Sequence, residues 1–373
     1  MKRILTIVAL ASVLAAPSFA KDKAPKNEKV NKVIFLIGDG MGLPAVATYM
    51  YDQNLEQTAF DRAQFTGFSK TYSANSRVTD SAAGGTALAT GYKTGNGMLG
   101  MTLDQTPVNS VAYYAKQEGK SVGIICTSNV CDATPGAFYA HTPSRGNGGD
   151  IAQSIIDARY DVVMGGGMDF FTVNKDQDGT VLYDKAKAAG FNFLETPEEF
   201  YKTTSTDSPV LGLFAGGNYP MVIDRDSDFL ADALNHTLDL FENNKKGFFI
   251  MVEGSHIDHA AHANNTEQLI FEMEEFNKVV NAAMDYADTH KGTLVVVAAD
   301  HETGGLAIVG GSKDFHLADT GIGVKYATSG HTACPIVVYS YGASAWQFSG
   351  FMENTEVGKK IGRLLVKNKE AFK

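Results

Sequence analysis

The stretch FFIMVEGSHIDHAAH, residues 248–262, decides how the rest of this chain is interpreted. Its first five residues are apolar and follow Gly247, which is typical of a short buried strand. Carboxylates and histidines come directly afterwards: Glu253, Asp258 and His262. Asp258 and His262 are four residues apart, so they share one face if Asp258 begins a helix. Ligand sites in open α/β sheets lie beyond the carboxyl ends of the strands, so this pattern predicts a site directly after a strand.

Similar apolar runs recur along the chain and alternate with amphipathic segments. Six runs predict strands: Val33–Ile37, Val122–Cys126, Asp161–Met164, Gly247–Val252, Thr293–Ala298 and Pro335–Tyr339. Helical spacing of apolar residues predicts helices at Ser110–Glu118, Gly149–Ala158, Asp228–Asn243, Thr266–Thr289 and Glu356–Val366. The alternation predicts a three-layer α/β sandwich, with helices on both faces of a mainly parallel central sheet. Neither a linker nor a repeat divides residues 31–373, which are interpreted as one domain.

Polar residues that can bind metals follow four of the predicted strands. They are Asp39, Asp132 with Thr134, Glu253, and Asp300 with His301, and His331 directly precedes a fifth strand. Seven of the nine histidines fall between His256 and His331. Because the carboxyl ends of parallel strands meet at one edge of a sheet, we expect these side chains to form one site.

The residue types predict more than one kind of metal ion. Imidazole mixed with carboxylate is the ligand set expected for Zn²⁺, and it is supplied by Asp258, His262, Asp300, His301 and His331. Asp39, Asp132, Thr134 and Glu253 offer only oxygen, which suits Mg²⁺ better. Two metal ions about 4 Å apart are typical of in-line phosphoryl displacement.

A nucleophile and an anion-binding residue complete this hypothesis. In TDSAAGGT (residues 79–86), Ser81 precedes a small-residue run, Ala82 to Thr90, which can form a helix. The amino end of that helix would favour an alkoxide or a phosphate at Ser81, although Asp-Ser before a helix is also an ordinary cap. Arg145 lies in a turn-rich loop, and its guanidinium can donate two parallel hydrogen bonds to a phosphoryl group.

Composition limits the cellular compartment and the partners. The 373-residue chain carries a formal net charge of -10 without a basic tract, which argues against a nucleic-acid-binding surface. Residues 1–20 have the basic start, apolar core and small-x-small ending of a cleaved signal peptide, and residues 21–30 resemble a flexible leader. A periplasmic or secreted protein is therefore expected, with no membrane span after the signal is removed.

Two further features have alternative interpretations. Cys126 and Cys131 are close enough in sequence to form a disulfide in an exported protein, although buried free thiols are the more common outcome. Residues 174–185 have the alternating oxygens of a calcium loop, but Lys185 stands where the closing Glu belongs. A turn built from turn-forming residues is the preferred interpretation of that segment.

Seven motifs resemble those of the metal-dependent alkaline phosphatases, in the family order and across most of the mature chain. They are IGDGMG (37–42), TDSAA (79–83), DATP (132–135), HTPSR (141–145), EGSHIDHAAH (253–262), ADHETGG (299–305) and GHT (330–332). The resemblance implies an exported phosphomonoesterase that hydrolyses small phosphate monoesters through a phosphoserine at Ser81, releases inorganic phosphate, and uses two Zn²⁺ and one Mg²⁺. Residues 31–373 would be the alkaline phosphatase-like catalytic domain, and a homodimer is left open.

The resemblance also implies the role of each residue. One zinc would be held by Asp258, His262 and His331, and the second by Asp39, Asp300 and His301. The magnesium would be held by Asp39, Thr134, Glu253 and, directly or through water, Asp132. Arg145 would bind the phosphate, His259 would contact it through water, and Asp80 would orient Arg145 from behind. His256 has no role in the family pattern and is interpreted as a surface residue.

Two alternatives remain beside this interpretation. A phosphodiesterase of the same superfamily would need space for a second ester group, where Arg145 instead addresses two charged oxygens. A non-catalytic periplasmic phosphate- or metal-binding protein would not need an activated Ser81. A sulfatase is disfavoured because Ser81-Ala82-Ala83-Gly84 lacks the Cys/Ser-x-Pro-x-Arg context that its modified residue requires.

Overall fold

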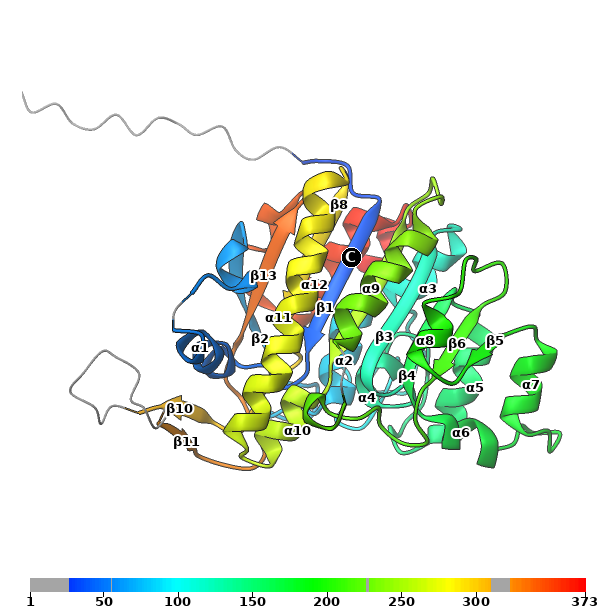
Figure 1. Cartoon of the computed structure of the whole chain (residues 1–373), viewed down its shortest axis with the longest axis horizontal. Helices are drawn as coiled ribbons and strands as arrows, with labels where there is room; N and C mark the ends of the chain where they lie inside the picture. Colours follow the sequence, from blue (N-terminus) through cyan, green and yellow to red (C-terminus); the bar gives the residue numbers. More distant parts are fainter. Residues whose placement is uncertain (1–26, 55, 226–227, 310–322) are drawn as a thin grey trace, which may run out of the picture.

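A ten-stranded sheet forms the centre of the protein in the computed structural model, which describes residues 27–54, 56–225, 228–309 and 323–373 (Figure 1). The order of its strands is β14-β2-β13-β8-β1-β7-β3-β4-β6-β5. In chain order their bounds are β1 Lys32–Gly38, β2 Phe65–Lys70, β3 Ser121–Asn129, β4 Val162–Gly166, β5 Asn192–Leu194, β6 Val210–Leu213, β7 Phe248–Gly254, β8 Thr293–Ala298, β13 Ile336–Gly342 and β14 Gly350–Glu353. The predicted signal peptide and most of the leader lie outside the described residues.

The sheet is mainly parallel, as predicted. Seven of its nine neighbouring pairs are parallel, and the two exceptions are the pairs of β13 with β8 and with β2. All six predicted strands are present. β1 lies at the centre, paired with β7 and β8, and the side chains of all three strands are almost entirely buried. Their continuous Val, Ile, Leu and Phe content suits strands that are covered on both faces.

Helices cover both faces of the sheet, which confirms the three-layer α/β sandwich. Figure 1 shows α9 (Phe229–Phe241) and α11 (Thr266–Thr289) crossing in front of the central strands, with α12 (Asn354–Leu365) behind them. The other α-helices are α1 Leu43–Asp52, α2 Ser81–Thr90, α3 Val111–Gln117, α4 Ala133–Gly136, α5 Gly148–Ala158, α6 Met168–Val173, α7 Leu182–Ala188, α8 Pro197–Phe200 and α10 His256–His262. No helix in the described residues has the length and apolar character needed to cross a bilayer.

Four small strands lie outside the main sheet and belong to the segments that follow β8. They are β9 Glu302–Thr303, which pairs with β12 His331–Thr332, and β10 Leu306–Ile308, which pairs with β11 Val324–Tyr326. The β9–β12 pair matters for the site because it brings His331 beside the chain that leaves β8. Thr303 and His331 are direct partners in this ladder.

Two alternatives from the sequence are decided by side-chain positions. Cys126 and Cys131 are both free, buried thiols, so the more common outcome holds. In residues 174–185, Lys185 pairs with Asp176 at 3.0 Å, and the same carboxylate accepts the backbone N–H groups of Asp178 and Thr180. These bonds are those of a turn that Asp176 caps, as the preferred interpretation proposed.

Candidate metal and phosphate site

Ser81 is the first residue of a completely buried helix, α2, whose N-cap is Asp80. The Asp80 carboxylate accepts the N–H of Ala83 at 3.0 Å and that of Gly97 at 2.8 Å, which fixes the start of the helix. Ser81 is 3% exposed, and its Oγ lies 3.2 Å from Nε2 of His301. The expected helix is therefore confirmed, and the hydroxyl at its amino end faces the histidine that follows β8.

The small residues of α2 allow close packing around the site. A Cβ on Gly84 would come within 3.0 Å of the Asp300 backbone oxygen, and one on Gly85 within 3.3 Å of the Thr134 Cα. The helix thus touches two chain segments that carry predicted metal ligands. Gly40 has a φ of +66°, and a Cβ there would lie 2.7 Å from the Asp258 carboxylate, so the turn after β1 requires glycine.

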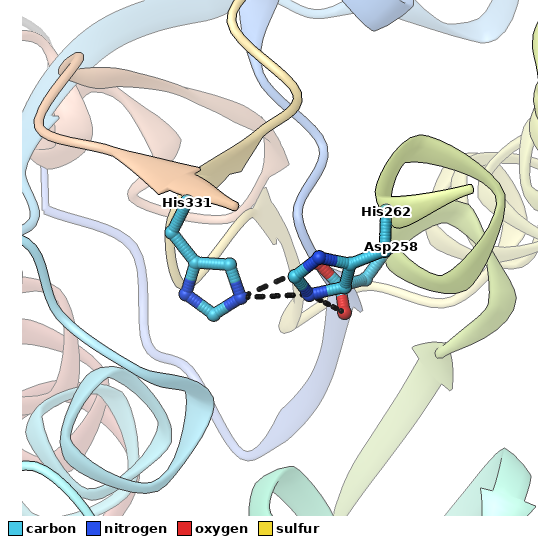
Figure 2. A group of neighbouring side chains, drawn as sticks. All are labelled: Asp258, His262 and His331. Carbon is cyan, nitrogen blue, oxygen red and sulfur yellow. Dashed lines mark hydrogen bonds and ion pairs between the residues drawn. The ribbon is translucent and has the colours of Figure 1, made fainter. Parts of the chain in front are cut away.

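Asp258, His262 and His331 form one compact group (Figure 2). His262 Nε2 lies 3.2 Å from Asp258 Oδ2 and 3.1 Å from His331 Nε2, and His331 Nε2 lies 3.7 Å from Asp258 Oδ1. Four ligands placed tetrahedrally at zinc–ligand distances stand about 3.3 Å from one another. The spacing of these two nitrogens and the Asp258 carboxylate therefore suits a zinc ion.

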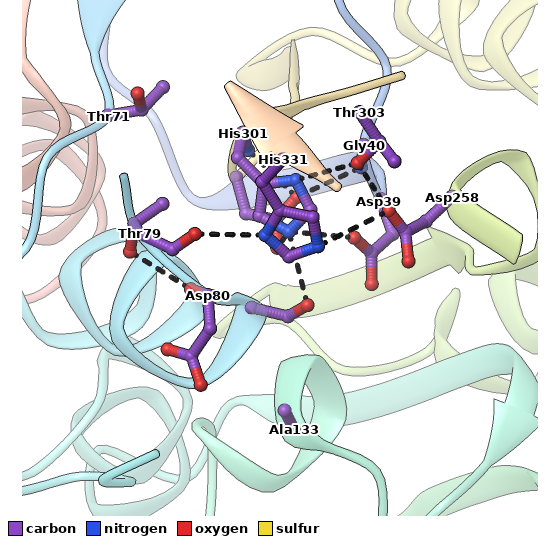
Figure 3. Close-up of polar contacts among 12 residues, drawn as sticks. Asp39, Gly40, Thr71, Thr79, Asp80, Ala133, Asp258, His301, Thr303 and His331 are labelled. Atoms are coloured by element: carbon purple, nitrogen blue, oxygen red, sulfur yellow. Dashed lines mark hydrogen bonds and ion pairs between the residues drawn. The ribbon is translucent and has the colours of Figure 1, made fainter. Parts of the chain in front are cut away.

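A second group surrounds Nε2 of His301. This atom lies 3.2 Å from Asp300 Oδ2, 3.4 Å from Asp39 Oδ1 and 3.2 Å from Ser81 Oγ. The His301 ring stacks on that of His331 with their centroids 3.6 Å apart, so the two groups are adjacent (Figure 3). Asp258 lies within reach of both groups, because its carboxylate oxygen is also close to the ligand atoms of Asp39 and His301.

Hydrogen bonds of the second ring nitrogen orient all three histidines. His262 Nδ1 bonds to the Ser329 carbonyl at 2.6 Å, and His331 Nδ1 bonds to the Thr79 carbonyl at 2.9 Å. His301 Nδ1 contacts the Thr303 hydroxyl at 3.2 Å. A carbonyl only accepts, so Nδ1 of His262 and of His331 carries a proton, and Nε2 is the ring nitrogen that faces the cluster and would bind a metal. Histidines that bind metals usually donate their other ring N–H to such a partner, which fixes the orientation of the ring.

Thr303 determines the tautomer of the remaining histidine. The Thr303 hydroxyl donates its one proton to Asp258 Oδ1. Its contact with His301 must therefore be one in which Thr303 Oγ accepts and His301 Nδ1 donates. Burial lowers the pKa of His301 to about 4, and the neutral ring then carries its lone pair on Nε2. Thr303 lies within the ADHETGG motif, but the sequence pattern gave it no role. The backbone carbonyls of Thr79 and Ser329 had no sequence signal at all.

The charges of the cluster call for a cation. The hydrogen bond with Asp258 raises the pKa of His262 to about 9, so one proton is held between these residues when no metal is bound. Burial, together with the nearby Asp300, raises the pKa of Asp39, and burial with the nearby Asp132 raises that of Glu253. Buried carboxylates repel one another when they are ionised, and a divalent metal ion bound between them strongly stabilises the ionised form.

The predicted magnesium ligands leave buried oxygens without partners. Within the described part of the chain, the buried side-chain oxygens that lack a hydrogen bond include one each from Asp39, Thr134 and Glu253, and also one from Asp300, a predicted zinc ligand. Glu253 is the next-to-last residue of β7, and Thr134 lies in α4, which follows the neighbouring strand β3. Buried oxygens are normally satisfied, so a cluster of unsatisfied ones fits a hard cation.

Arg145 lies between two carboxylates at the rim of the site. Its Nη2 is 2.9 Å from Asp132 Oδ1, and its Nη1 is 3.7 Å from Asp80 Oδ2. The side chain keeps 36% exposure, so the guanidinium remains accessible to a ligand. The contact between Asp80 and Arg145 that the sequence suggested is therefore present in the structure, and Asp132 makes the closer contact.

His256 is not a surface residue, which corrects the interpretation from the sequence. It is 2% exposed, and its Nε2 bonds to the Tyr219 carbonyl at 2.7 Å. Its Nδ1 lies 2.8 Å from Nδ1 of His259, which is half-buried. Helix α10 places His256 inward beside the segment that precedes α9, a contact between distant parts of the chain that the local sequence does not reveal.

Comparisons with known proteins agree with this geometry. The family model for alkaline phosphatase matches residues 30–322. Alkaline phosphatase 4 of Bacillus subtilis (strain 168) is 40% identical over 344 residues, which cover 85% of this chain and 73% of that protein. The solved alkaline phosphatase from the Antarctic bacterium TAB5 is 32% identical with a TM-score of 0.83, covering 91% of this chain and 98% of its own.

A second solved structure bears on the metals. It is a histidine-to-aspartate mutant of the TAB5 alkaline phosphatase with Mg bound in its M3 site; it has a TM-score of 0.83 and 32% identity, and the match covers 91% of this chain and 99% of that one. The fold, the cluster of ligands beyond the strand ends and the matched family model all agree. The chain belongs to the alkaline phosphatase family, whose members are metal-dependent, and it is a phosphomonoester hydrolase.

Proposed function

We propose that the chain hydrolyses phosphate monoesters in two steps, through a phosphoserine at Ser81, and that it holds two Zn²⁺ and one Mg²⁺. The observation that carries the proposal is the convergence of three oriented Nε2 atoms and three carboxylates beside the Ser81 hydroxyl, which lies 3.2 Å from His301 Nε2. Asp258, His262 and His331 would hold one zinc, and Asp39, Asp300 and His301 the other. Bound zinc ions would supply positive charge at the nucleophile and at the leaving oxygen.

The protein's own groups perform the remaining tasks. Ser81 attacks phosphorus in line, the ester P–O bond breaks, and the alcohol leaves with a proton. Water then attacks the phosphoserine, which releases inorganic phosphate and restores the Ser81 hydroxyl. Arg145 would bind two non-bridging oxygens, held in place by Asp132 and Asp80. His259 would contact the phosphate through water.

Oxygen ligands support magnesium at the third site. Asp39, Thr134 and Glu253, with Asp132 directly or through water, would bind it, and the unsatisfied buried oxygens of the first three fit this role. A histidine at position 132 would favour a transition metal, whereas aspartate keeps the donor set hard. The aspartate-containing mutant of the TAB5 enzyme, with Mg in its M3 site, supports the same pairing.

The remaining proposals concern processing and partners. We propose that residues 1–20 are removed as a signal peptide, that residues 21–30 form a flexible leader, and that residues 31–373 form a single catalytic domain in the periplasm or outside the cell. Small phosphate monoesters and inorganic phosphate are the proposed ligands, and a solution mass measurement decides between a monomer and a homodimer.

Two measurements on the purified protein test the proposed chemistry. Metal analysis should find two zinc ions and one magnesium ion per chain. Acid quenching during turnover of a nitrophenyl monoester should trap phosphoserine in the peptide that contains Ser81. A diester hydrolysed faster than the monoester would contradict the proposal and favour a phosphodiesterase. Tight phosphate binding without turnover in the metal-loaded protein would instead favour a binding protein.

A further inference from the structure

A basic cleft lies at the end of the sheet opposite to the metal cluster. It has a volume of about 760 Å³ and is lined by the residues that lead into β1, β3 and β7, together with the end of α12 and the segment after it. We define the basic cleft by six of its lining residues: Lys29, Lys120, Lys245, Lys246, Lys367 and Lys369. The metal ligands follow the opposite ends of the same strands, so the two sites lie roughly 20 Å apart, the length of β1.

The charge of the cleft is opposite to that of the chain. Seven of its sixteen lining residues are Lys or Arg and two are carboxylates, whereas the whole protein has a formal net charge of -10. Arg363 is neutralised by Glu356 at 2.8 Å. The six lysines of the basic cleft have no carboxylate within 4.0 Å among the described residues, so their charges act together on the space between them.

Lys120 is the unusual member of this group. It is 7% exposed, and its ammonium donates to the backbone carbonyls of Lys246 at 2.6 Å and of Asn31 at 3.4 Å. Burial lowers its pKa; the attraction of Glu118 offsets this effect only in part, and the like charges of Lys29 and Lys367 add to the lowering. Glu118, one of the two carboxylates in the lining, already accepts the backbone N–H groups of Lys367 and Asn368. An anion in the cleft would supply the missing charge.

The shape of the cleft suggests the class of ligand. Its volume is that of a small-molecule site rather than of a flat contact surface. Lysines come from four separate segments of chain, so a single phosphate would leave several of them unpaired. We propose that the basic cleft binds a small soluble anion that carries two or more phosphoryl or sulfate groups, independently of the metal site.

Sucrose octasulfate is a suitable probe, because it has several tetrahedral anionic groups and is not a phosphate ester. Calorimetric titration into the metal-loaded full chain should show one site whose affinity falls as salt is added. The probe should leave the KM for a nitrophenyl monoester unchanged, since the metal site is remote. Binding to vesicles is a second test, in which phosphatidylcholine vesicles with and without phosphatidylglycerol are compared. Neither kind of vesicle should retain the protein.

Paired variants locate the binding. The double change Lys245→Glu with Lys246→Glu should lower the affinity for the probe by about tenfold or more, because two attractive charges become repulsive. Lys187→Glu with Lys202→Glu makes the same change of charge at exposed lysines outside the cleft and should leave the affinity nearly unchanged. The proposal would be overturned if the two double variants bound the probe equally well, if the probe competed with the monoester, or if it did not bind at all. In that case the lysines would only balance the charge of the helix ends there. Binding to phosphatidylglycerol vesicles without binding to the sulfated sugar would also overturn it, in favour of a membrane contact.

Discussion

The hydroxyl of Ser81 lies 3.2 Å from Nε2 of His301, and the same nitrogen lies 3.2 Å from Asp300 and 3.4 Å from Asp39. Thr303 holds the proton of His301 on Nδ1. The Nε2 atom of His301 can therefore accept a hydrogen bond from Ser81 or bind a metal, but it cannot donate. The nucleophile proposed here therefore shares one small space with the ligands of the proposed second zinc.

Ser81→Ala should remove the phosphoenzyme and lower the turnover of a nitrophenyl monoester by about three orders of magnitude or more, as expected for loss of a nucleophile. Acid-quenched samples analysed for phosphoserine provide the measurement, and zinc content should remain at the level of the unaltered protein. A variant that still forms an acid-stable phosphoserine would show that another residue is the nucleophile.

Thr303→Val should weaken metal binding or activity by about 10- to 100-fold, the range seen when the outer partner of a metal ligand is lost. Valine has nearly the same shape but cannot bond to Asp258 or to His301. Thr303→Ser keeps the hydroxyl and serves as the matched control, with metal retention after dialysis as the measurement. Equal metal retention by the two variants would mean that Thr303 only fills space.

Arg145→Ala should raise the inhibition constant for inorganic phosphate by an amount equivalent to about 2 kcal/mol, the scale of a hydrogen bond to a charged group. Arg145→Lys keeps the charge but loses the paired N–H groups, so its inhibition constant for phosphate should lie between those of the alanine variant and the unaltered protein. Asp80→Asn removes the longer, 3.7 Å ion pair and one of the two backbone hydrogen bonds that the carboxylate accepts, but it leaves the closer contact of Arg145 with Asp132 and should have a smaller effect on phosphate inhibition. Unchanged phosphate inhibition in the alanine variant would exclude the proposed role.

Glu272 should make the folded protein less stable as the pH rises. Burial raises its pKa to about 7 from the ordinary 4.5, and its carboxylate accepts the Val222 N–H at 2.9 Å. Since the folded-state pKa is the higher one, the stabilisation is complete below about pH 4.5 and is lost as the pH rises through 7. The full shift corresponds to at most about 3 kcal/mol.

Glu272→Gln keeps an acceptor for Val222 and cannot ionise, so it isolates this effect. The difference in unfolding free energy between this variant and the unaltered protein, both metal-loaded, should favour the variant increasingly between about pH 5 and pH 8. Denaturant unfolding at several pH values is the measurement. A difference that stays constant with pH would show that Glu272 titrates normally in the folded protein.

Several elements escaped prediction for identifiable physical reasons. β2 (FTGFSK) alternates buried and exposed residues and contains a glycine, while β5 and β14 have only three and four residues, so none forms a long apolar run. Near the outer strands of a sheet, pairing depends on the neighbour more than on the strand's own hydrophobicity. The reversed direction of β13 is likewise set by its partners β8 and β2.

The sequence by itself determined the chemistry that is available. Apolar runs that end in Asp39, Glu253 and Asp300 predict a buried parallel sheet with its ligands at one edge, because strand length, burial and the side-chain alternation of strands are local properties. The helix at Ser81 and the spacing of Asp258 and His262 were predictable for the same reason. The motifs also identified the family before any geometry was known.

Only the tertiary structure decided how these groups are held. The protons of His262, His301 and His331 are placed by the Ser329 carbonyl, the Thr303 hydroxyl and the Thr79 carbonyl, two of which are backbone groups that every residue carries. Hydrogen bonds from a side chain to a backbone carbonyl as far as 252 residues away leave no mark on composition or periodicity. The burial of His256 and the convergence of separate lysines on the basic cleft have the same origin, because long-range packing brings these segments together.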